Sequence, residues 1–360
     1  MGVLLKLIDT LMGSVLIIIF SICKYLTSFI KPKNKNILII RLRSLGESIL
    51  TLPLIKKLKD ENFEISVLCS KENVEIFKRV EFVDEIFIIE NLKWIKLFKK
   101  FDYSIDTEPF SRISAALSFF FGKKSIGFSN TAIRRLVYNF GINYKEIHSV
   151  YNFSMLLTPL GIKFKPKNLI ELKYSKDEVE KVEKILKALN KRVLIGMHVS
   201  TGETSVWRAW KPKKWAKLIE KIIKNYKNIA IILTGTKFDR NINKKVINLV
   251  KNENVIDLSG KFNLGELSYL MKKLKVFISN DTGPMHLAAA QGCKVIGLFG
   301  PNLPERFAPF KGIAIYKAEK LSCSPCINVH KGEFKKCKYN GKCMDLIKVD
   351  DVFKEISQIL

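Results

Sequence analysis

Residues 275–300 read KVFISNDTGPMHLAAAQGCKVIGLFG, and this stretch decides the fold. It contains an apolar run of strand length, a polar turn, an apolar segment of helix length and a second apolar run over 294–299. A strand, a helix and a strand in this order predict a right-handed crossover between parallel strands. The polar residues 280–283 and His286 lie where the first strand ends and the helix begins. They are either packing residues or part of a binding site.

The same alternation extends outward from this stretch. Strand-like runs begin at Arg192, Asn228 and Asn254, with helical patterns between them, and a first series of the same kind occupies 36–128. The alternation pauses near residue 175. Two doubly wound α/β domains in tandem fit this order better than one long sheet. Ligands in such folds bind beyond the carboxyl ends of the strands, so we expect a site in a cleft between two facing domains.

The pattern divides the chain into four parts. A hydrophobic segment with a basic linker covers 1–35, and a first Rossmann-like domain covers 36–174. A second Rossmann-like domain with a cysteine cluster covers 175–343, and apolar residues at helical spacing predict a C-terminal helix over 344–360.

The charge of the chain favours anionic partners. Among 360 residues there are 62 Lys and Arg against 34 Asp and Glu, a net charge of +28 at pH 7. Such an excess is typical of proteins that meet nucleic acid, an acidic membrane face or a phosphorylated substrate. Much of it, however, is Lys scattered at helical spacing, which favours a solvated surface as the simpler explanation.

The N-terminal segment is long and apolar. Residues 11–30 carry a single charge, Lys24, and the basic sequence KPKNKN follows. A signal peptide is not expected, because Lys31 and Pro32 stand where a small-residue cleavage site would be. The alternatives are a spanning helix and an interfacial helix, and both leave the main body cytoplasmic.

Polar clusters follow the first strand of each predicted domain. In RLRSLGESILTLP, 41–53, Glu47 opens a helix, where its carboxylate is either favoured by the helix dipole or a general base. In HVSTGETSVWRAWKPKKW, 198–215, Thr201 offers a hydroxyl and Arg208 a positive charge that suits a diphosphate. No GxGxxG or Walker sequence is present, so the usual dinucleotide and P-loop sites are not expected.

The opening stretch supplies a third cluster. Asp281, Thr282 and Gly283 lead into Pro284, which suits the first position of a helix. The N–H groups of that first turn and the helix dipole both favour a phosphate. The simpler alternative is that Asp281 is only a helix cap and His286 only a core histidine.

Four of the seven cysteines are clustered, which favours a reducing compartment over an oxidised secreted scaffold. Their spacing, C-x2-C-x10-C-x5-C, suits a structural, tetrahedral Zn²⁺. Free thiols, one local disulfide and an iron–sulfur cluster are the alternatives. The four residues are Cys323, Cys326, Cys337 and Cys343.

From about residue 36 to its end, the chain resembles glycosyltransferase family 9, the ADP-heptose:lipopolysaccharide heptosyltransferases. The resemblance rests on six separated motifs in the family's order, of which the DTGPMHLAAA element is the most specific. They are ILIIRLRSLGESILTLPLIKKLK, HSVYNFSMLLTPLGI, RAWKPKKWAKLIE, LTGTKFDR, NVIDLSGKFNLGELSYLMKKLKVFISNDTGPMHLAAAQG and VIGLFGPNLPERFAPF.

The resemblance implies the GT-B architecture, with the acceptor bound by the first domain and the nucleotide-sugar by the second. Thr201 and Arg208 match a hydroxyl and a basic residue that contact the donor diphosphate, and Asp239 matches a position that contacts the ribose. The family commonly has Lys where this chain has Arg208, and Glu where it has Asp239. These differences keep the charge of each side chain and change its length. The element whose N–H groups meet the diphosphate matches Asp281, Thr282, Gly283 and His286.

The resemblance also implies the catalytic base. Family members typically have Asp in an S-x-G-D element, and this chain has Ser44, Leu45, Gly46 and Glu47. Glu47 would deprotonate the acceptor hydroxyl, which attacks the anomeric carbon with inversion while the diphosphate departs. The extra methylene moves the carboxylate by about an ångström, and such a displacement can slow a reaction. Candidates for binding anionic groups of the acceptor are Arg41, Arg43 and Arg112.

The predicted function is that of an inverting glycosyltransferase. It would move a heptose or related sugar, from ADP-heptose by the resemblance, to a lipopolysaccharide core or lipid-linked acceptor at the cytoplasmic face of the inner membrane. Catalysis is expected to need no cofactor, Zn²⁺ at the cysteines would be structural, and nucleic acid is not an expected partner. The alternatives are a transferase of another activated sugar to a surface polysaccharide and a non-catalytic, anion-binding relative.

Overall fold

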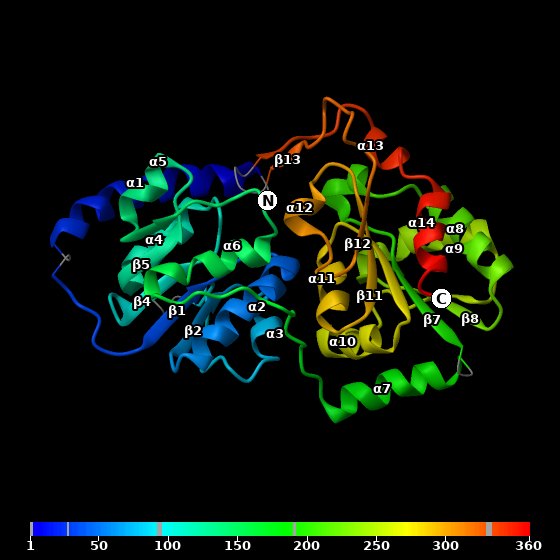
Figure 1. Ribbon diagram of the computed structural model, residues 1–360, viewed down its shortest axis with the longest axis horizontal. Coiled ribbons are helices and arrows are strands. Elements are labelled where there is room, and N and C mark those ends of the chain that lie inside the picture. The colour runs from blue at the N-terminus through cyan, green and yellow to red at the C-terminus, as the bar shows by residue number, and fades with distance from the viewer. Residues whose placement is uncertain (1–2, 27–28, 92–95, 190–191, 329–332) are drawn as a thin grey trace. The chain divides into compact units, whose positions relative to one another are not determined.

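The computed structural model describes residues 3–26, 29–91, 96–189, 192–328 and 333–360. The chain divides into two compact units (Figure 1). The first unit comprises Met1–Lys167 and Asn328–Glu333, and the second comprises Asn168–Ile327 and Phe334–Leu360.

The first unit contains a parallel six-stranded sheet of order β3-β2-β1-β4-β5-β6. Two of its inner strands, over Asn36–Ile40 and Glu64–Cys69, are almost wholly buried, which explains why they consist largely of apolar residues. The strands are β1 (Asn36–Ile40), β2 (Glu64–Cys69), β3 (Glu85–Ile88), β4 (Phe101–Asp106), β5 (Gly122–Phe128) and β6 (Phe140–Ile142). The helices are α1 (Val3–Leu26), α2 (Leu45–Asp60), α3 (Val74–Phe77), α4 (Arg112–Phe121), α5 (Ala132–Val137), α6 (Ser149–Met155) and the 3₁₀ turn η2 (Thr158–Leu160).

The second unit repeats this topology, with the order β9-β8-β7-β10-β11-β12 and parallel pairing throughout. Its strands are β7 (Val193–His198), β8 (Ile229–Leu233), β9 (Val255–Asp257), β10 (Val276–Asn280), β11 (Lys294–Phe299) and β12 (Ile313–Tyr316). Its helices are α7 (Lys176–Lys187), η3 (Glu203–Arg208), α8 (Pro212–Asn225), η4 (Lys237–Asp239), α9 (Arg240–Val250), α10 (Leu264–Lys273), α11 (Gly283–Ala290), α12 (Pro304–Phe307), α13 (Lys342–Asp345) and α14 (Val349–Ser357). The short strands β13 (Ile327–Asn328) and β14 (Glu333–Phe334) pair in a separate two-stranded sheet.

Each sheet has one point at which the strand order reverses. In the first unit it lies between β1 and β4, and in the second between β7 and β10. The crossover helices leave the sheet toward opposite faces at such a point, so the strand ends there form a crevice in which α/β proteins bind ligands. The two predicted α/β sheets are thereby confirmed. Of the candidate residues, Asp281 follows directly on β10, and Glu47 lies in the first turn of α2, the helix that follows β1.

The C-terminus differs from the single helix predicted over 344–360. The structure has a short α13, a break, and then α14. The carbonyl groups of Asp345 and Ile347 accept hydrogen bonds from Lys214 Nζ at 2.6 and 2.7 Å, and the Trp210 indole donates to Ile347 at 3.1 Å. Side chains of the α8 region therefore take the carbonyls that a continuous helix would use, and the helix is interrupted.

The N-terminal helix α1 lies along α4 and α5 of the first unit (Figure 1). Ile17 is fully buried in a small core with Ala115, Ala116 and Phe119 of α4, which Val137 and Tyr138 complete. Within the described residues, Leu7–Lys24 is the one helical stretch long and apolar enough to cross a membrane.

Candidate functional site

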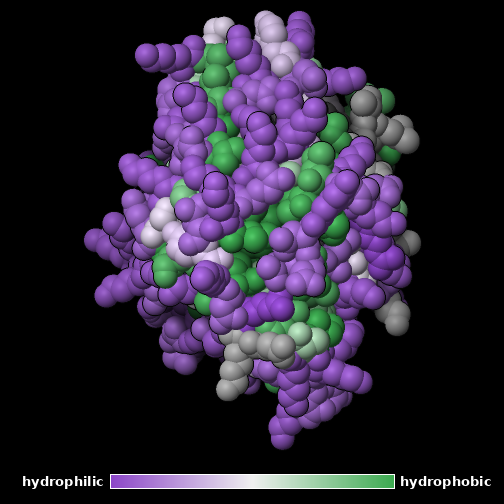
Figure 2. All heavy atoms as spheres, turned by 90° about the vertical axis from the view of Figure 1, so that its right-hand side faces the viewer, coloured by the Kyte–Doolittle hydropathy of each residue, from purple (hydrophilic) through white to green (hydrophobic). Residues whose placement is uncertain are grey.

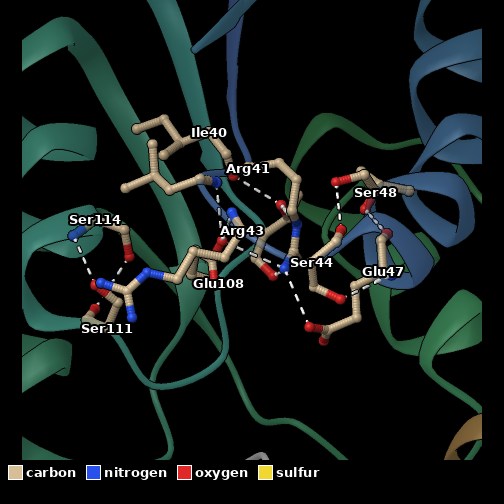
Figure 3. Close-up of polar contacts among 12 residues, drawn as sticks. Ile40, Arg41, Arg43, Ser44, Glu47, Ser48, Glu108, Ser111 and Ser114 are labelled. Carbon is tan, nitrogen blue, oxygen red and sulfur yellow. Dashed lines mark hydrogen bonds and ion pairs between the residues drawn. The ribbon is translucent and has the colours of Figure 1, made fainter. Parts of the chain in front are cut away.

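At the first reversal point, two carboxylates flank one buried guanidinium. Arg41, directly after β1, is fully buried, with its Nη1 3.6 Å from Glu47 Oε2 and 3.4 Å from Glu108 Oε1 (Figure 3). Glu108, two residues after β4, also accepts the N–H groups of Leu42 and Arg43 at 2.9 and 3.2 Å. Glu47 lies in the first turn of α2 with its side chain 14% exposed. The carboxylate of Glu47 is thus fixed in place on a side chain that is partly exposed, with its Oε1 atom buried.

Arg41 is held from several sides. Its Nε donates to Thr107 Oγ1 at 2.9 Å, its Nη2 donates to the Thr107 carbonyl, and its guanidinium lies 5.1 Å from the ring centre of Phe153. We predicted that Arg41 contacts the acceptor. In the structure its guanidinium instead contacts the carboxylates of Glu47 and Glu108 and orients them. Arg41 is fully buried and pairs with these two carboxylates, and its contact with an acceptor stays a prediction.

Ser44, the N-cap of α2, has an unusual backbone conformation, with φ 67° and ψ 114°. Non-glycine residues rarely adopt positive φ, and such strain persists where surrounding contacts impose it. The Ser44 hydroxyl accepts the N–H of Glu47 at 3.4 Å, and its carbonyl accepts both the N–H and the hydroxyl of Ser48. Asn73 then joins Ser48 Oγ to the Arg41 carbonyl, both at 2.9 Å. This buried chain of hydrogen bonds fixes the turn that presents Glu47.

The other two arginines predicted for the acceptor lie in different places. Arg43 is half-buried beside Glu108, in the turn that follows β1. Arg112 instead contacts the N-terminal helix, since its Nη1 donates to the Thr10 carbonyl at 3.1 Å and to Ser14 Oγ at 2.6 Å. The acceptor role of Arg43 stays a prediction, and that of Arg112 competes with its contact with α1.

A second buried charge cluster supports the loop that bears Glu108. Arg134 of α5 donates to the Glu108 carbonyl at 2.6 Å and to Asp106 Oδ2 at 3.1 Å. Asp106 also accepts the hydroxyls of Tyr138 and Ser114, at 2.5 and 2.8 Å. Burial raises the pKa of Asp106, and the Arg134 charge opposes that rise. The cluster has no direct access to solvent, so its role is structural.

At the second reversal point, Asp281 and Arg208 form the central pair. Arg208 Nη2 donates to the Asp281 carbonyl at 2.5 Å and lies 3.2 Å from its Oδ2, which also accepts the amide of buried Asn302 at 3.0 Å. Arg208 Nε is buried and has no hydrogen-bond partner among the described residues. The Arg208 side chain is nevertheless 21% exposed. Its guanidinium is therefore held at one edge by Asp281 while part of the side chain stays exposed.

The turn from β10 to α11 is anchored to the end of β7. Asn280 is fully buried, and its amide donates to the Val199 carbonyl at 3.0 Å while its Oδ1 accepts the Trp210 N–H at 2.9 Å. Thr282 caps α11 without a side-chain capping bond, and Gly283 and Pro284 begin the helix. The first turn of α11 is thus set to present N–H groups to an anion. His286, at 3% exposure, lies beneath that turn.

Polar residues at the ends of β7 and β8 complete the second site. Asp239 Oδ2 accepts the N–H and the hydroxyl of Thr236 at 2.6 and 2.8 Å, and a hydrogen bond from Ser200 also lowers its pKa. His198 Nδ1 lies 3.3 Å from Thr234 Oγ1. Thr201 is half-buried in the loop that follows β7. The predicted donor residues therefore lie on adjoining loops of one unit.

The environment of His198 predicts a pH dependence of stability. Burial lowers the pKa of His198, and the negative charge of Asp239 opposes this. An unfolded histidine titrates near pH 6.5, so below that pH the unfolded chain binds a proton that the folded chain excludes. Stability should then fall with acidification from about pH 6.5, by at most about 1.4 kcal/mol per pH unit. Urea unfolding midpoints across this range measure the slope.

A His198→Gln variant should lose this part of the slope, because Gln has no proton to gain. The lowered pKa of Asp239 also makes stability fall with acidification, but only at pH values near 4 and below. The contributions of His198 and Asp239 to the slope can therefore be separated by pH. An unchanged slope between about pH 6.5 and pH 5 in the variant would rule out His198 as the source.

The four clustered cysteines line one pocket of about 300 Å³ and form no disulfide. Cys337 Sγ accepts the N–H groups of Tyr339 and Gly341, at 3.4 and 3.2 Å. Burial raises the pKa of Cys343 to about 11. In the described part of the chain, no three Cys, His, Asp or Glu side chains are arranged to hold a metal ion. Zinc binding here stays a prediction that would require the thiols to move together.

Several residues at the two sites were not singled out from the sequence. They are Glu108, Asn302 and His198. Glu108 and His198 could have been found by searching the end of every predicted strand for polar side chains. The amide of Asn302 carries no such signal, because only the folded chain brings its partner Asp281 to it.

Comparison with known proteins adds an independent line of evidence. A family model described as glycosyltransferase family 9 (heptosyltransferase) matches residues 95–337, more than half of the chain. Lipopolysaccharide heptosyltransferase 1 of Campylobacter coli is 27% identical over 356 residues, which cover 90% of this chain and 98% of the relative.

Solved structures show the same fold. A glycosyl transferase family 9 protein from Veillonella parvula has a TM-score of 0.73 at 20% identity, over 92% of this chain and 98% of its own. The E. coli ADP-heptose lipopolysaccharide heptosyltransferase II has a TM-score of 0.70 at 19% identity, over 90% of this chain and 98% of its own. At these identities the likeness concerns the fold alone.

Proposed function

Because the chain belongs to glycosyltransferase family 9, the heptosyltransferase family, we propose that it transfers a heptose from ADP-heptose to a lipopolysaccharide-core acceptor, with inversion at the anomeric carbon. The observation that carries the proposal is the pairing of Arg208 with Asp281 at the β7/β10 reversal point, beside the N-terminus of α11. A related sugar with another nucleotide, transferred to a surface polysaccharide, is the second candidate.

The donor side of the proposed reaction uses positive charge that the protein provides without a metal. As the bond to the anomeric carbon breaks, negative charge grows on the departing diphosphate. Arg208 and the N–H groups at the start of α11 would stabilise this charge more strongly in the transition state than in the ground state. We therefore propose that no cofactor is required, and transfer rates with and without EDTA test this.

The acceptor side uses Glu47 as the general base. Arg41, which also pairs with Glu108, holds the Glu47 carboxylate at the β1/β4 reversal point, and the Ser44 turn fixes the helix that bears it. A carboxylate that takes the proton of the acceptor hydroxyl makes the oxygen a better nucleophile. A lipid-linked acceptor would place the reaction at the cytoplasmic face of the inner membrane.

The proposed donor is tested by measuring the melting temperature of the protein with ADP-heptose, UDP-sugars and GDP-sugars. A ligand that binds only the folded chain stabilises it, by about 2.7 kcal/mol when the ligand concentration is a hundred times the dissociation constant. This stabilisation raises the melting temperature. ADP-heptose should give the largest shift and should support transfer. A larger shift with a UDP- or GDP-sugar would favour the second candidate, and no shift with any nucleotide would contradict both.

Substitution of Arg208 tests the donor site directly. Arg208→Ala should lower kcat/KM about 10²-fold, because it removes the charge that faces the departing diphosphate. Arg208→Lys, the residue common in the family, should retain most of the activity. Lys211→Ala is the matched control, since Lys211 lies three positions on, is 51% exposed and pairs with Asp345. Steady-state kinetics measure the effect. If Arg208→Ala kept the kcat/KM of the parent, Arg208 would have no part in the mechanism.

A further inference from the structure

The N-terminal helix α1 exposes a continuous apolar face to solvent. Large side chains recur at spacings of three and four residues along it, which places them on one side of the helix. Each is between 49% and 65% exposed. We call this set the outer face of α1; it comprises Leu7, Leu11, Met12, Val15, Ile18, Ile19 and Ile22.

The opposite face of α1 is docked on the first unit through polar contacts. The Asp9 carboxylate is buried, and it accepts the Ser111 hydroxyl at 2.7 Å and the N–H groups of Arg112 and Ile113, both at 3.1 Å. Asp9 thus caps the N-terminus of α4, where a negative charge is favoured by the helix dipole. A docked aspartate of this kind fixes both the position and the rotation of α1.

Two further contacts fix the same orientation. Gly13 allows close approach to α4, because a Cβ there would lie 2.6 Å from Arg112 Cβ. At the other end of α1, Lys24 Nζ donates to the Tyr138 carbonyl at 2.7 Å and to the Leu136 carbonyl at 3.3 Å. The outer face therefore points away from the unit from Leu7 to Ile22.

A solvent-exposed apolar face of this length is expected to be buried against a binding partner or a membrane. A helix that is apolar on all sides is normally buried in a core or in a membrane. A contiguous apolar surface of this kind marks an interaction site. The contrast with the second unit is plain, since the face drawn in Figure 2 is mainly hydrophilic, with apolar groups in narrow strips. Leu136 of α5 is also exposed, and its carbonyl accepts a hydrogen bond from Lys24 of α1.

The charge around the outer face fits an anionic lipid surface. Residues 10–46, which include most of α1, and residues 109–145, which include α4 and α5, contain no Asp or Glu. Each of these segments contains six Lys or Arg residues. Basic residues beside an apolar helical face attract anionic headgroups. The exposed ones among them are Lys31, Lys33, Lys35, Arg135 and Lys145.

The docked face also decides between an in-plane and a spanning helix. Spanning would pull Asp9 away from its three hydrogen bonds and move it, with Lys24, into or across the hydrocarbon, where charged side chains are strongly disfavoured. Lying in the interface keeps every one of these contacts and covers only the outer face.

We propose that α1 is an in-plane anchor, with its outer face inserted into the headgroup and acyl boundary of an anionic bilayer and its inner face docked on α4 and α5. The anchor itself does not depend on the proposed transfer reaction. One consequence does rest on it: Ser111, which binds Asp9, also accepts Arg134, and Arg134 holds the Glu108 carbonyl. The anchor would thus set the acceptor side at a fixed height above the lipid.

Co-flotation of the full-length protein with vesicles tests the anchor. The protein should float with vesicles of phosphatidylethanolamine and phosphatidylglycerol, and less with neutral phosphatidylcholine vesicles. The double variant Leu11→Gln, Ile18→Gln should lower the vesicle partition coefficient at least about 10-fold, because both side chains lose apolar area that only lipid would cover. Its melting temperature without lipid should stay that of the parent, since both residues point away from the unit.

Leu249→Gln is the matched control, because Leu249 is 45% exposed on α9 of the second unit. It should leave flotation unchanged. Equal flotation of the double variant and the parent would overturn the proposal. So would a lipid-free dimer that the double variant dissociates, since a second copy of the chain would then cover the outer face.

Insertion depth separates the two membrane modes. Tryptophan placed singly at Leu7, Val15 and Ile22 should be quenched to a similar extent by shallowly brominated lipids, after subtraction of the parent signal. A spanning helix would instead place the middle position deepest, so preferential quenching of Val15→Trp by lipids brominated near the chain end would overturn the in-plane anchor. Neither readout uses transfer activity, so failure here leaves the donor and base assignments intact.

Discussion

Replacement of Glu47 by Gln is expected to slow transfer about 10²- to 10⁴-fold, the usual contribution of a general base. The amide keeps the shape of the side chain but cannot take a proton from the acceptor hydroxyl. Arg41 keeps its second partner, Glu108 Oε1 at 3.4 Å, so the turn should remain folded. Single-turnover transfer measures the rate, and the melting-temperature shift with ADP should match that of the parent because the donor residues belong to the other unit.

Two further variants sharpen this result. Glu47→Asp retains the carboxylate but withdraws it by about an ångström, so its rate should fall between those of Gln and the parent. Asp60→Asn is the matched control, because Asp60 lies on the same helix with its side chain 51% exposed. If Glu47→Gln kept more than a tenth of the parental rate, a different group would have to serve as the base.

The largest effect on stability is expected from Arg134→Met. The substitution leaves the Asp106 carboxylate fully buried without its ionic partner, and breaking such a pair typically costs about 3–5 kcal/mol. For a unit of this size, the melting temperature of the first unit should fall by roughly 10 °C. The loop at Glu108 loses a hydrogen bond as well, so transfer should decline in the fraction that stays folded.

Differential scanning calorimetry measures this loss, with Arg135→Met as the control. Arg135 is the next residue on α5 and is exposed, so its substitution should change the melting temperature little. The double variant Arg134→Met, Asp106→Leu should regain part of the loss, because removing both charges leaves none buried and unpaired. Equal melting temperatures for Arg134→Met and Arg135→Met would show that the buried pair contributes little.

Most of the fold could be predicted from the sequence, because the central strands are buried on both faces. Burial of this kind requires continuous apolar runs such as Ile37–Ile40, and these runs are visible without knowledge of their partners. The edge strands β6 and β12 escaped prediction for the converse reason. They are only three and four residues long and are partly exposed, so the runs FGI and IAIY are too short to indicate a strand by themselves.

The candidate sites were predictable in part. Asp281 follows directly on a recognisable strand and Glu47 begins the helix after another, so the rule that ligands bind at strand ends identifies both. The burial of Arg41 could not be foreseen, because an arginine after a strand is usually solvated and only the packing of Phe153 and Thr107 encloses this one. Contacts between residues distant in sequence, such as Asn302 with Asp281, likewise depend on the folded chain.

The repeated strand order of the two sheets has a consequence for how such an enzyme diversifies. Each sheet reverses at its own point, and each point bears one set of polar residues: Glu47, Arg41 and Glu108 in the first unit, and Arg208, Asp281 and Asn302 in the second. Within the proposed function, one half would recognise the acceptor and the other the donor. Recombination of whole halves between relatives could then change one specificity while inheriting the other intact.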